Sequence, residues 1–132
     1  MNPPTIAVLD TSVVIDPVAD LSGRAETFCV AAVTLAELQF GVASAVDAAV
    51  LASRQLRYLE VLHDLTPVPY TELVAHWHGT FMAMDEQAGR NPRTRMADLV
   101  IAATAKTLGA FVITRNPGDF RSVEGIVPIV AV

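Results

Sequence analysis

Four acidic residues lie at points where strands are predicted to give way to helices or loops. They are Asp10 in VLDTSVVID, Glu37 in TLAELQFGV, Asp98 in RMADLVIAATA and Asp119 in VITRNPGDF. Two carboxylates about 4 Å apart repel each other by roughly 4 kcal/mol at an effective dielectric constant of about 20. Mg2+ or Mn2+ offsets such repulsion, because both are hard cations that prefer oxygen ligands and are often bound together with substrate phosphates. The four acids therefore suggest metal-dependent phosphodiester chemistry.

Polar and basic side chains accompany the acids in the sequence. Hydroxyl groups follow Asp10 and end the strand before Asp119, and arginines crowd the segments around Asp98 and Asp119. Such groups hold phosphate oxygens by hydrogen bonds and charge without reading base sequence. The candidates for substrate positioning are Thr11, Ser12, Thr114, Asn116, Arg93, Arg95 and Arg115. Asn116 also competes with Asp119 for the fourth position of the site.

Two of the acids also have structural explanations as helix caps. Asp10 is of the type that caps a helix after a strand. Thr34 and Glu37 fit a capping box, in which the Glu side chain returns to the N–H of the cap residue.

The other two acids have structural explanations of a different kind. Helical spacing places Asp98 on the same face as Ile101 and Ala105, towards the core, where Arg95 one turn earlier is a candidate ion-pair partner. Asp119 follows a Pro-Gly pair, and aspartate in such turns is usually solvated.

Composition narrows the class of protein. The chain has 132 residues, of which 52% are apolar and 17% charged, which is enough material for the core of one domain over residues 1–132. Its mean hydropathy is +0.44, but no apolar run approaches the roughly 18 residues of a membrane span. The N-terminal segment lacks a secretory pattern, and Cys29 is the one cysteine. We therefore expect a cytoplasmic protein without disulfides or a thiolate metal cluster.

Net charge limits the mode of nucleic-acid binding. The formal charge is −5, and a protein that coats nucleic acid by bulk electrostatics needs a basic face. More than half of the nine basic residues, however, lie near Asp98 or Asp119. Local contacts with phosphates remain compatible with the sequence.

Strand and helix patterns alternate along the chain. Strands are predicted at 6–9, 28–33, 66–69, 110–114 and 126–130. Helices are predicted at 12–19, 34–41, 45–62, 70–88 and 96–108. This order predicts a three-layer α/β sandwich with a central parallel sheet of about five strands flanked by helices. Ligands bind such sheets beyond the carboxyl ends of the strands, where all four acids can converge.

Two predicted helices carry apolar stripes. Residues 45–62 place Val46, Ala49, Val50, Leu56 and Leu59 on one face. Residues 70–88 carry Leu73, Trp77, Phe81 and Met84, which we interpret as core or as a subunit interface.

Taken together, the segments DTSVVID, AELQFG and ADLVIAATA resemble the PIN domain family, and in length and motifs the chain resembles a VapC-type toxin ribonuclease of bacterial toxin–antitoxin pairs. The resemblance covers essentially the whole chain. It implies a Mg2+- or Mn2+-dependent endoribonuclease that hydrolyses RNA phosphodiester bonds, with Asp10, Glu37 and Asp98 as metal-site acids and Asp119 as a more variable fourth. It also implies a homodimer and a neutralising antitoxin protein. Many relatives carry an Asp directly after the Thr-Arg pair, where this chain has Asn116, so the fourth ligand and a second metal ion stay open.

Other classes share part of the pattern. A phosphoacceptor receiver domain needs a lysine at a late strand end, whereas Lys106 lies within a predicted helix. A haloacid-type phosphatase needs an Asp-x-Asp pair that the segment at Asp10 lacks. A non-catalytic RNA- or protein-binding module and a structure-specific DNA nuclease remain as alternatives.

Overall fold

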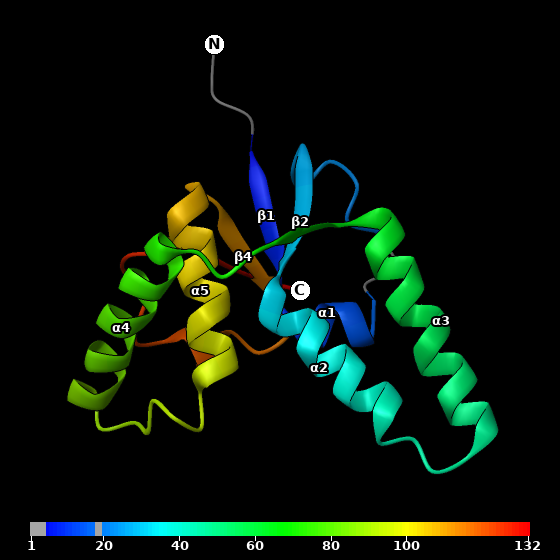
Figure 1. The fold of residues 1–132 in the computed structure, drawn as a ribbon. Coiled ribbons are helices and arrows are strands. Elements are labelled where there is room, and N and C mark those ends of the chain that lie inside the picture. The colour runs from blue at the N-terminus through cyan, green and yellow to red at the C-terminus, as the bar shows by residue number, and fades with distance from the viewer. Residues whose placement is uncertain (1–4, 18–19) are drawn as a thin grey trace.

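The structure is a computed structural model that describes residues 5–17 and 20–132. Within them the chain forms five strands, five α-helices and one short 3-10 helix (Figure 1). The strands are β1 (Ile6–Leu9), β2 (Thr27–Ala31), β3 (Thr66–Val68), β4 (Phe111–Thr114) and β5 (Ile129–Ala131). The helices are α1 (Thr11–Ile15), α2 (Ala32–Ala43), α3 (Ala48–Asp64), α4 (Glu72–Gln87), α5 (Met96–Leu108) and the 3-10 helix η1 (Pro117–Phe120).

The five described strands form one parallel sheet in the order β3-β2-β1-β4-β5. Their short apolar runs suit strands that are covered on both faces. β1 lies at the centre and pairs with β2 on one side and β4 on the other. The strand order reverses between β1 and β4, and parallel sheets bind ligands in the crevice at such a switch point. The predicted fold class is therefore confirmed.

Successive residues of the sheet build two separate cores because their side chains alternate between its faces. On one face, Val8 and Val112 pack with the apolar sides of α4 and α5. On the other, Leu9 and Ile113 pack with α1, α2 and the end of α3. Figure 1 shows the two helical layers on opposite sides of the strands.

Helix α5 is the most deeply buried helix of the fold. Its sequence is apolar around almost the whole circumference, and the residues from Leu99 to Ala105 are all buried. Gly109 ends it in the left-handed conformation at φ 64°, which a glycine adopts without strain. The helix has the predicted bounds of 96–108. Its packing fixes the N-terminal turn, which carries Asp98, at the carboxyl edge of the sheet.

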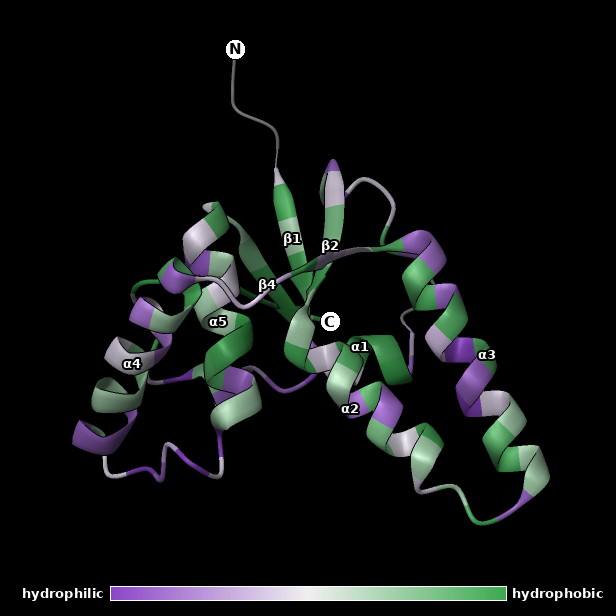
Figure 2. Ribbon diagram, in the orientation of Figure 1, coloured by the Kyte–Doolittle hydropathy of each residue, from purple (hydrophilic) through white to green (hydrophobic). Residues whose placement is uncertain are grey.

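Helices α2 and α3 form an antiparallel hairpin on the other side of the sheet (Figure 1). Val46 of the predicted apolar stripe precedes α3, and most of the stripe faces solvent. Val61 is buried, whereas Leu56 and Leu59 are 59% and 57% exposed. Green and purple residues alternate along α3 in Figure 2, whereas the middle of α5 is mostly green. We call α2 and α3 the α2–α3 arm.

Several predicted boundaries were wrong. The second strand ends at Ala31 rather than Val33, because the chain turns into α2 at Ala32. The last strand is Ile129–Ala131, since residues 126–127 belong to a turn. The first helix ends at Ile15, and Val18 and Ala19 of its predicted span lie outside the described residues.

In the part of the chain that the structure describes, no helix has the length and apolar character needed to cross a membrane.

Candidate active site

Asp10 follows β1 and is held by two hydroxyl groups. Its carboxylate is 4% exposed and does not cap α1. Instead, Oδ2 accepts hydrogen bonds from Ser12 Oγ at 2.7 Å and from Thr114 Oγ1, at the end of β4, at 2.8 Å. Both bonds reach the same oxygen, so they fix the rotation of the carboxylate at the switch point. Asp10 thus occupies the predicted N-cap position of α1, but its carboxylate makes no capping hydrogen bond.

Glu37 lies in the middle of α2, and its carboxylate is tied to Thr11. Thr11 Oγ1 donates to Glu37 Oε1 at 2.6 Å and lies 3.0 Å from the Thr34 hydroxyl oxygen. The predicted capping box is wrong, because α2 begins at Ala32 and Thr34 is a fully buried residue within the helix. This role of Thr34 was not predicted from the sequence. The sequence signal for this role was a single hydroxyl residue within an apolar segment.

Asp98 lies in the first turn of α5 and is the acid most affected by its surroundings. Burial, followed by the charges of Asp10 and Asp119 and a smaller contribution from Glu37, raises the pKa of Asp98 from 3.8 to about 7. Arg95 opposes this shift. Each of the other three acids acts on this carboxyl group, so the four predicted acids form one electrostatic cluster, which we call the acid cluster.

Asp119 lies in η1, and its carboxylate and backbone contact Arg95. Arg95 Nη1 donates to the Asp119 carbonyl oxygen at 3.2 Å and lies 3.5 Å from Oδ1. The same nitrogen lies 4.0 Å from Asp98 Oδ2. The predicted ion pair between Arg95 and Asp98 is thus present but long, and the shorter contact is with Asp119.

The donor set of the acid cluster matches a hard divalent cation, because every donor is an oxygen and the negative charges outnumber the guanidinium among them. In residues 5–17 and 20–132, however, no three histidine, cysteine, aspartate or glutamate side chains are gathered closely enough to hold an ion. Asp10 and Glu37 accept from hydroxyl groups, and Asp98 and Asp119 lie beside Arg95, so the acids affect one another without sharing a ligand position.

The remaining candidates differ in their position relative to the acids. Arg115 turns away and donates from Nε and Nη2 to the Asp16 carbonyl oxygen at 2.9 and 2.7 Å. Asn116 is exposed and donates its backbone N–H to Thr114. Arg93 is exposed in the loop before α5.

A buried network that was not predicted from the sequence supports η1, which carries Asp119. Asp85, fully buried at the end of α4, accepts from Ser122 Oγ at 2.7 Å and lies 3.9 Å from Arg90 Nε. Arg90 Nη2 donates to the Gly118 carbonyl oxygen at 3.0 Å. The network ties α4, the loop after it and η1 together. Its sequence signal was the i, i+4 spacing of Phe81 and Asp85, which puts both on the buried face.

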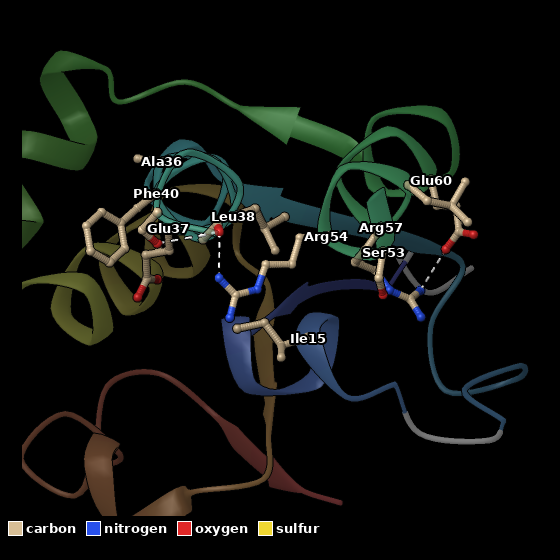
Figure 3. Close-up of a pocket in the computed structure, with 12 residues that line it drawn as sticks. Ile15, Ala36, Glu37, Leu38, Phe40, Ser53, Arg54, Arg57 and Glu60 are labelled. Carbon is tan, nitrogen blue, oxygen red and sulfur yellow. Dashed lines mark hydrogen bonds and ion pairs between the residues drawn. The ribbon is translucent and has the colours of Figure 1, made fainter. Parts of the chain in front are cut away.

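A groove of about 790 Å³ runs between the α2–α3 arm and the end of α1, and Glu37 lines it (Figure 3). Its apolar lining includes Ile15 and Phe40, which are 61% and 74% exposed. Arg54 crosses the gap from α3 and donates to the Gly41 carbonyl oxygen at 2.7 Å. The groove therefore joins an apolar surface to the acid cluster.

Comparison with known proteins agrees with this architecture. The PIN domain family model matches residues 7–126. A structure of VapBC-5, a member of the VapBC family of toxin–antitoxin systems from Mycobacterium tuberculosis, is 33% identical with a TM-score of 0.80, covering 98% of this chain and 100% of that chain. FitAcB from Neisseria gonorrhoeae is 26% identical with a TM-score of 0.70, covering 94% of this chain and 96% of that chain.

The fold extends to more distant structures. VapBC2 from Rickettsia felis, bound to a promoter DNA fragment, is 20% identical with a TM-score of 0.77, covering 97% of this chain and 99% of that chain. No curated protein matches the chain by sequence. The match of the family model over most of the sequence shows that the chain belongs to the PIN domain family.

Proposed function

We propose that this protein is a Mg2+- or Mn2+-dependent endoribonuclease and the toxin component of a toxin–antitoxin pair. The observation that carries the proposal is the acid cluster at the carboxyl edge of a PIN-type sheet, in which burial and the charges of the three other acids raise the pKa of Asp98 to about 7. Because like charges repel within such a cluster, binding of a cation stabilises it. A single nuclease domain over residues 1–132 is part of the proposal, supported by the family match over 7–126.

Asp10, Glu37, Asp98 and Asp119 would hold the metal. A bound ion would supply an activated water and stabilise the charge that develops on the leaving oxygen. Ser12 and Thr114 hold the Asp10 carboxylate in one orientation, and Thr11 does the same for Glu37. Because the hydroxyls fix these two carboxylates in advance, less ordering is required when cation and substrate bind.

Positioning of RNA would fall to the polar groups around the cluster. Arg93 and Asn116 are exposed, and Arg115 is bound to the carbonyl oxygen of Asp16 at the end of α1. Contacts of these side chains with phosphates give salt-dependent affinity without base specificity. Specificity for an RNA would then come from loops and from the shape of single-stranded segments.

The test is cleavage of a total RNA pool by the purified protein with Mg2+, with Mn2+ or with chelator, and with cut ends mapped by sequencing. We expect discrete metal-dependent cuts that Asp98→Asn abolishes. Asp64→Asn is the matched control, because its carboxylate is 67% exposed and pairs with His63 at the far end of α3. Equal cutting of matched DNA would instead identify a DNA nuclease. Metal-independent RNA binding without cleavage would identify a binding module.

The neutralising partner would be an antitoxin that fills the groove beside Glu37. Structures similar to this chain are described as a member of a family of toxin–antitoxin systems and as a toxin–antitoxin complex. An apolar segment of the antitoxin would cover Ile15 and Phe40, and one of its Arg or Lys side chains would reach the acid cluster. The exposed apolar lining supports the first contact, and the net charge of −5 supports the second.

Binding of a co-expressed candidate antitoxin tests this interface. Phe40→Glu places a charge in the groove and is expected to weaken copurification at least tenfold. Val46→Glu is the control, since Val46 is 97% exposed and does not line the groove. Removal of the antitoxin's basic residues is expected to restore cleavage. Equal loss with both valine and phenylalanine variants would argue against this groove.

We further propose that the protein is a homodimer. Leu73, near the start of α4, supports this, because its side chain is 61% exposed. Light scattering of the purified chain measures the assembly directly, and a monomeric mass at micromolar concentration would contradict the proposal.

A further inference from the structure

Arg95 holds a central place among the acids. It immediately precedes α5, and its side chain is 26% exposed. Its Nη1 lies 3.5 Å from Asp119 Oδ1 and 4.0 Å from Asp98 Oδ2, and it donates to the Asp119 carbonyl oxygen at 3.2 Å. One guanidinium therefore bridges the first turn of α5 and η1.

Neighbouring arginines have other partners. Arg115 is bound to the Asp16 carbonyl oxygen and carboxylate. Arg90 is bound to Asp85 and to the Gly118 carbonyl oxygen. Arg95, by contrast, is directed at two members of the acid cluster. It supplies positive charge at the place where a cation between Asp98 and Asp119 would lie.

We propose that Arg95 is an internal counter-ion that competes with divalent cations for Asp98 and Asp119, and so confines tight cation binding to the Asp10 side of the cluster. This inference rests on the proposed function, because it concerns the same metal site. The two halves of the acid cluster differ in the charge of the groups that bind them. Hydroxyl groups hold Asp10 and Glu37 without offsetting their charge, whereas a fixed positive charge offsets that of Asp98 and Asp119.

The competition has a simple electrostatic basis. A guanidinium cannot lose its proton in a protein, so a divalent ion that approaches Asp119 must either displace Arg95 or accept its repulsion. Removing the positive charge removes that repulsion. It also leaves the acids without their counter-ion when no metal is bound. Arg95→Gln should therefore bind cations more tightly and be less stable in chelator.

The test titrates Mn2+ into metal-free protein by calorimetry and counts bound ions by electron paramagnetic resonance. We expect Arg95→Gln to bind Mn2+ roughly tenfold more tightly than the wild type, or to bind one ion more. Arg121→Gln is the matched control, since it removes the same charge from an exposed residue just after η1. We expect its affinity to stay within about twofold of the wild type. Equal affinities together with equal numbers of bound ions in the two variants, or weaker binding by Arg95→Gln, would overturn the proposal.

Thermal unfolding gives a second readout that does not depend on activity. In chelator, Arg95→Gln should unfold at a lower temperature than the wild type, and Mn2+ should narrow or reverse the difference. Arg95→Met serves as a second neutral variant if Arg95→Gln does not fold. If the wild type binds Mn2+ and Asp10→Asn does not, an unchanged Arg95→Gln overturns this inference alone. If no variant binds Mn2+, the proposed function fails with it.

Discussion

Helices α5 and α3 lie on opposite sides of the same sheet but differ in how completely they are buried. In α5, whose residues are all described, the buried stretch runs unbroken from Leu99 to Ala105. In α3, also fully described, Val61 is the buried residue, and Leu56 and Leu59 face solvent. The α5 side is a closed core, whereas the α2–α3 arm has an apolar surface that its own chain does not cover.

This difference in burial corresponds to different roles of the two sides of the sheet. The acid cluster needs fixed side chains, and the closed packing of α5 holds Asp98 in place. The α2–α3 arm carries Glu37 and lines the apolar groove, in which Glu37 takes part. Exposed apolar patches of this kind mark interaction surfaces in soluble proteins. We therefore relate the α5 side to chemistry and the arm to control by a partner.

Deleting buried methyl groups should distinguish the two helices most strongly. Ile101→Ala removes a fully buried side chain of α5 and should lower the free energy of unfolding by about 2–5 kcal/mol. Leu59→Ala in α3 should change it by less than about 0.5 kcal/mol, because the side chain is largely in water already. Urea denaturation of both variants measures the contrast. Similar losses would mean that α3 is packed against something in solution, such as a second copy.

The buried network behind η1 should give the next largest effect. Asp85→Ala leaves Arg90 without its carboxylate in a largely buried position and should cost about 3 kcal/mol of stability. It should also reduce activity, because the Arg90 bond to Gly118 holds η1 and hence Asp119. Cleavage rate and unfolding free energy are measured together. Full activity in the folded variant would show that η1 does not need this support.

Asp98→Asn should stabilise the metal-free protein while abolishing its activity. The folded-state pKa of about 7 lies above the usual 3.8, so the folded form holds a proton that the unfolded chain has already released. Wild-type stability should therefore fall as pH rises from about 4 to 7, and the variant should not show this loss. Above pH 7 we expect an advantage on the order of 1–2 kcal/mol, after allowance for the partial exposure of the carboxyl group. Unfolding in chelator at pH 5 and pH 8 measures it, and an equal difference at both would contradict the shift.

Helix caps give the smallest effect and still distinguish the two regions. Thr71 caps α4 by accepting from Val74 N at 3.3 Å, and Asp47 caps α3 by accepting from Val50 N at 2.8 Å. Replacement of either by Ala should cost about 1 kcal/mol. We expect Thr71→Ala to lower global stability and Asp47→Ala mainly to speed hydrogen exchange at the start of α3. Uniform effects on exchange in both variants would mean that the arm unfolds with the core.

Much of the fold was readable from the sequence because its signals are local. Short apolar runs marked the strands, and the span of α5 followed from its helical spacing and Gly109. Register, capping and boundaries were less predictable. Thr34 looked like a cap because the sequence shows only neighbours along the chain, whereas its hydroxyl partner, Thr11, lies 23 residues away.

The sequence by itself determined which chemical groups are present and the edge of the sheet to which they are directed. Residue types and strand order are enough for that, because the carboxyl ends of parallel strands share one edge. Only the tertiary structure decided how the acids are held: Asp10 by Thr114 from 104 positions away, and Asp119 by Arg95 from 24 positions away. It also decided that the apolar stripe of α3 stays exposed. Such outcomes depend on which surfaces meet in three dimensions, and periodicity along the chain does not contain that information.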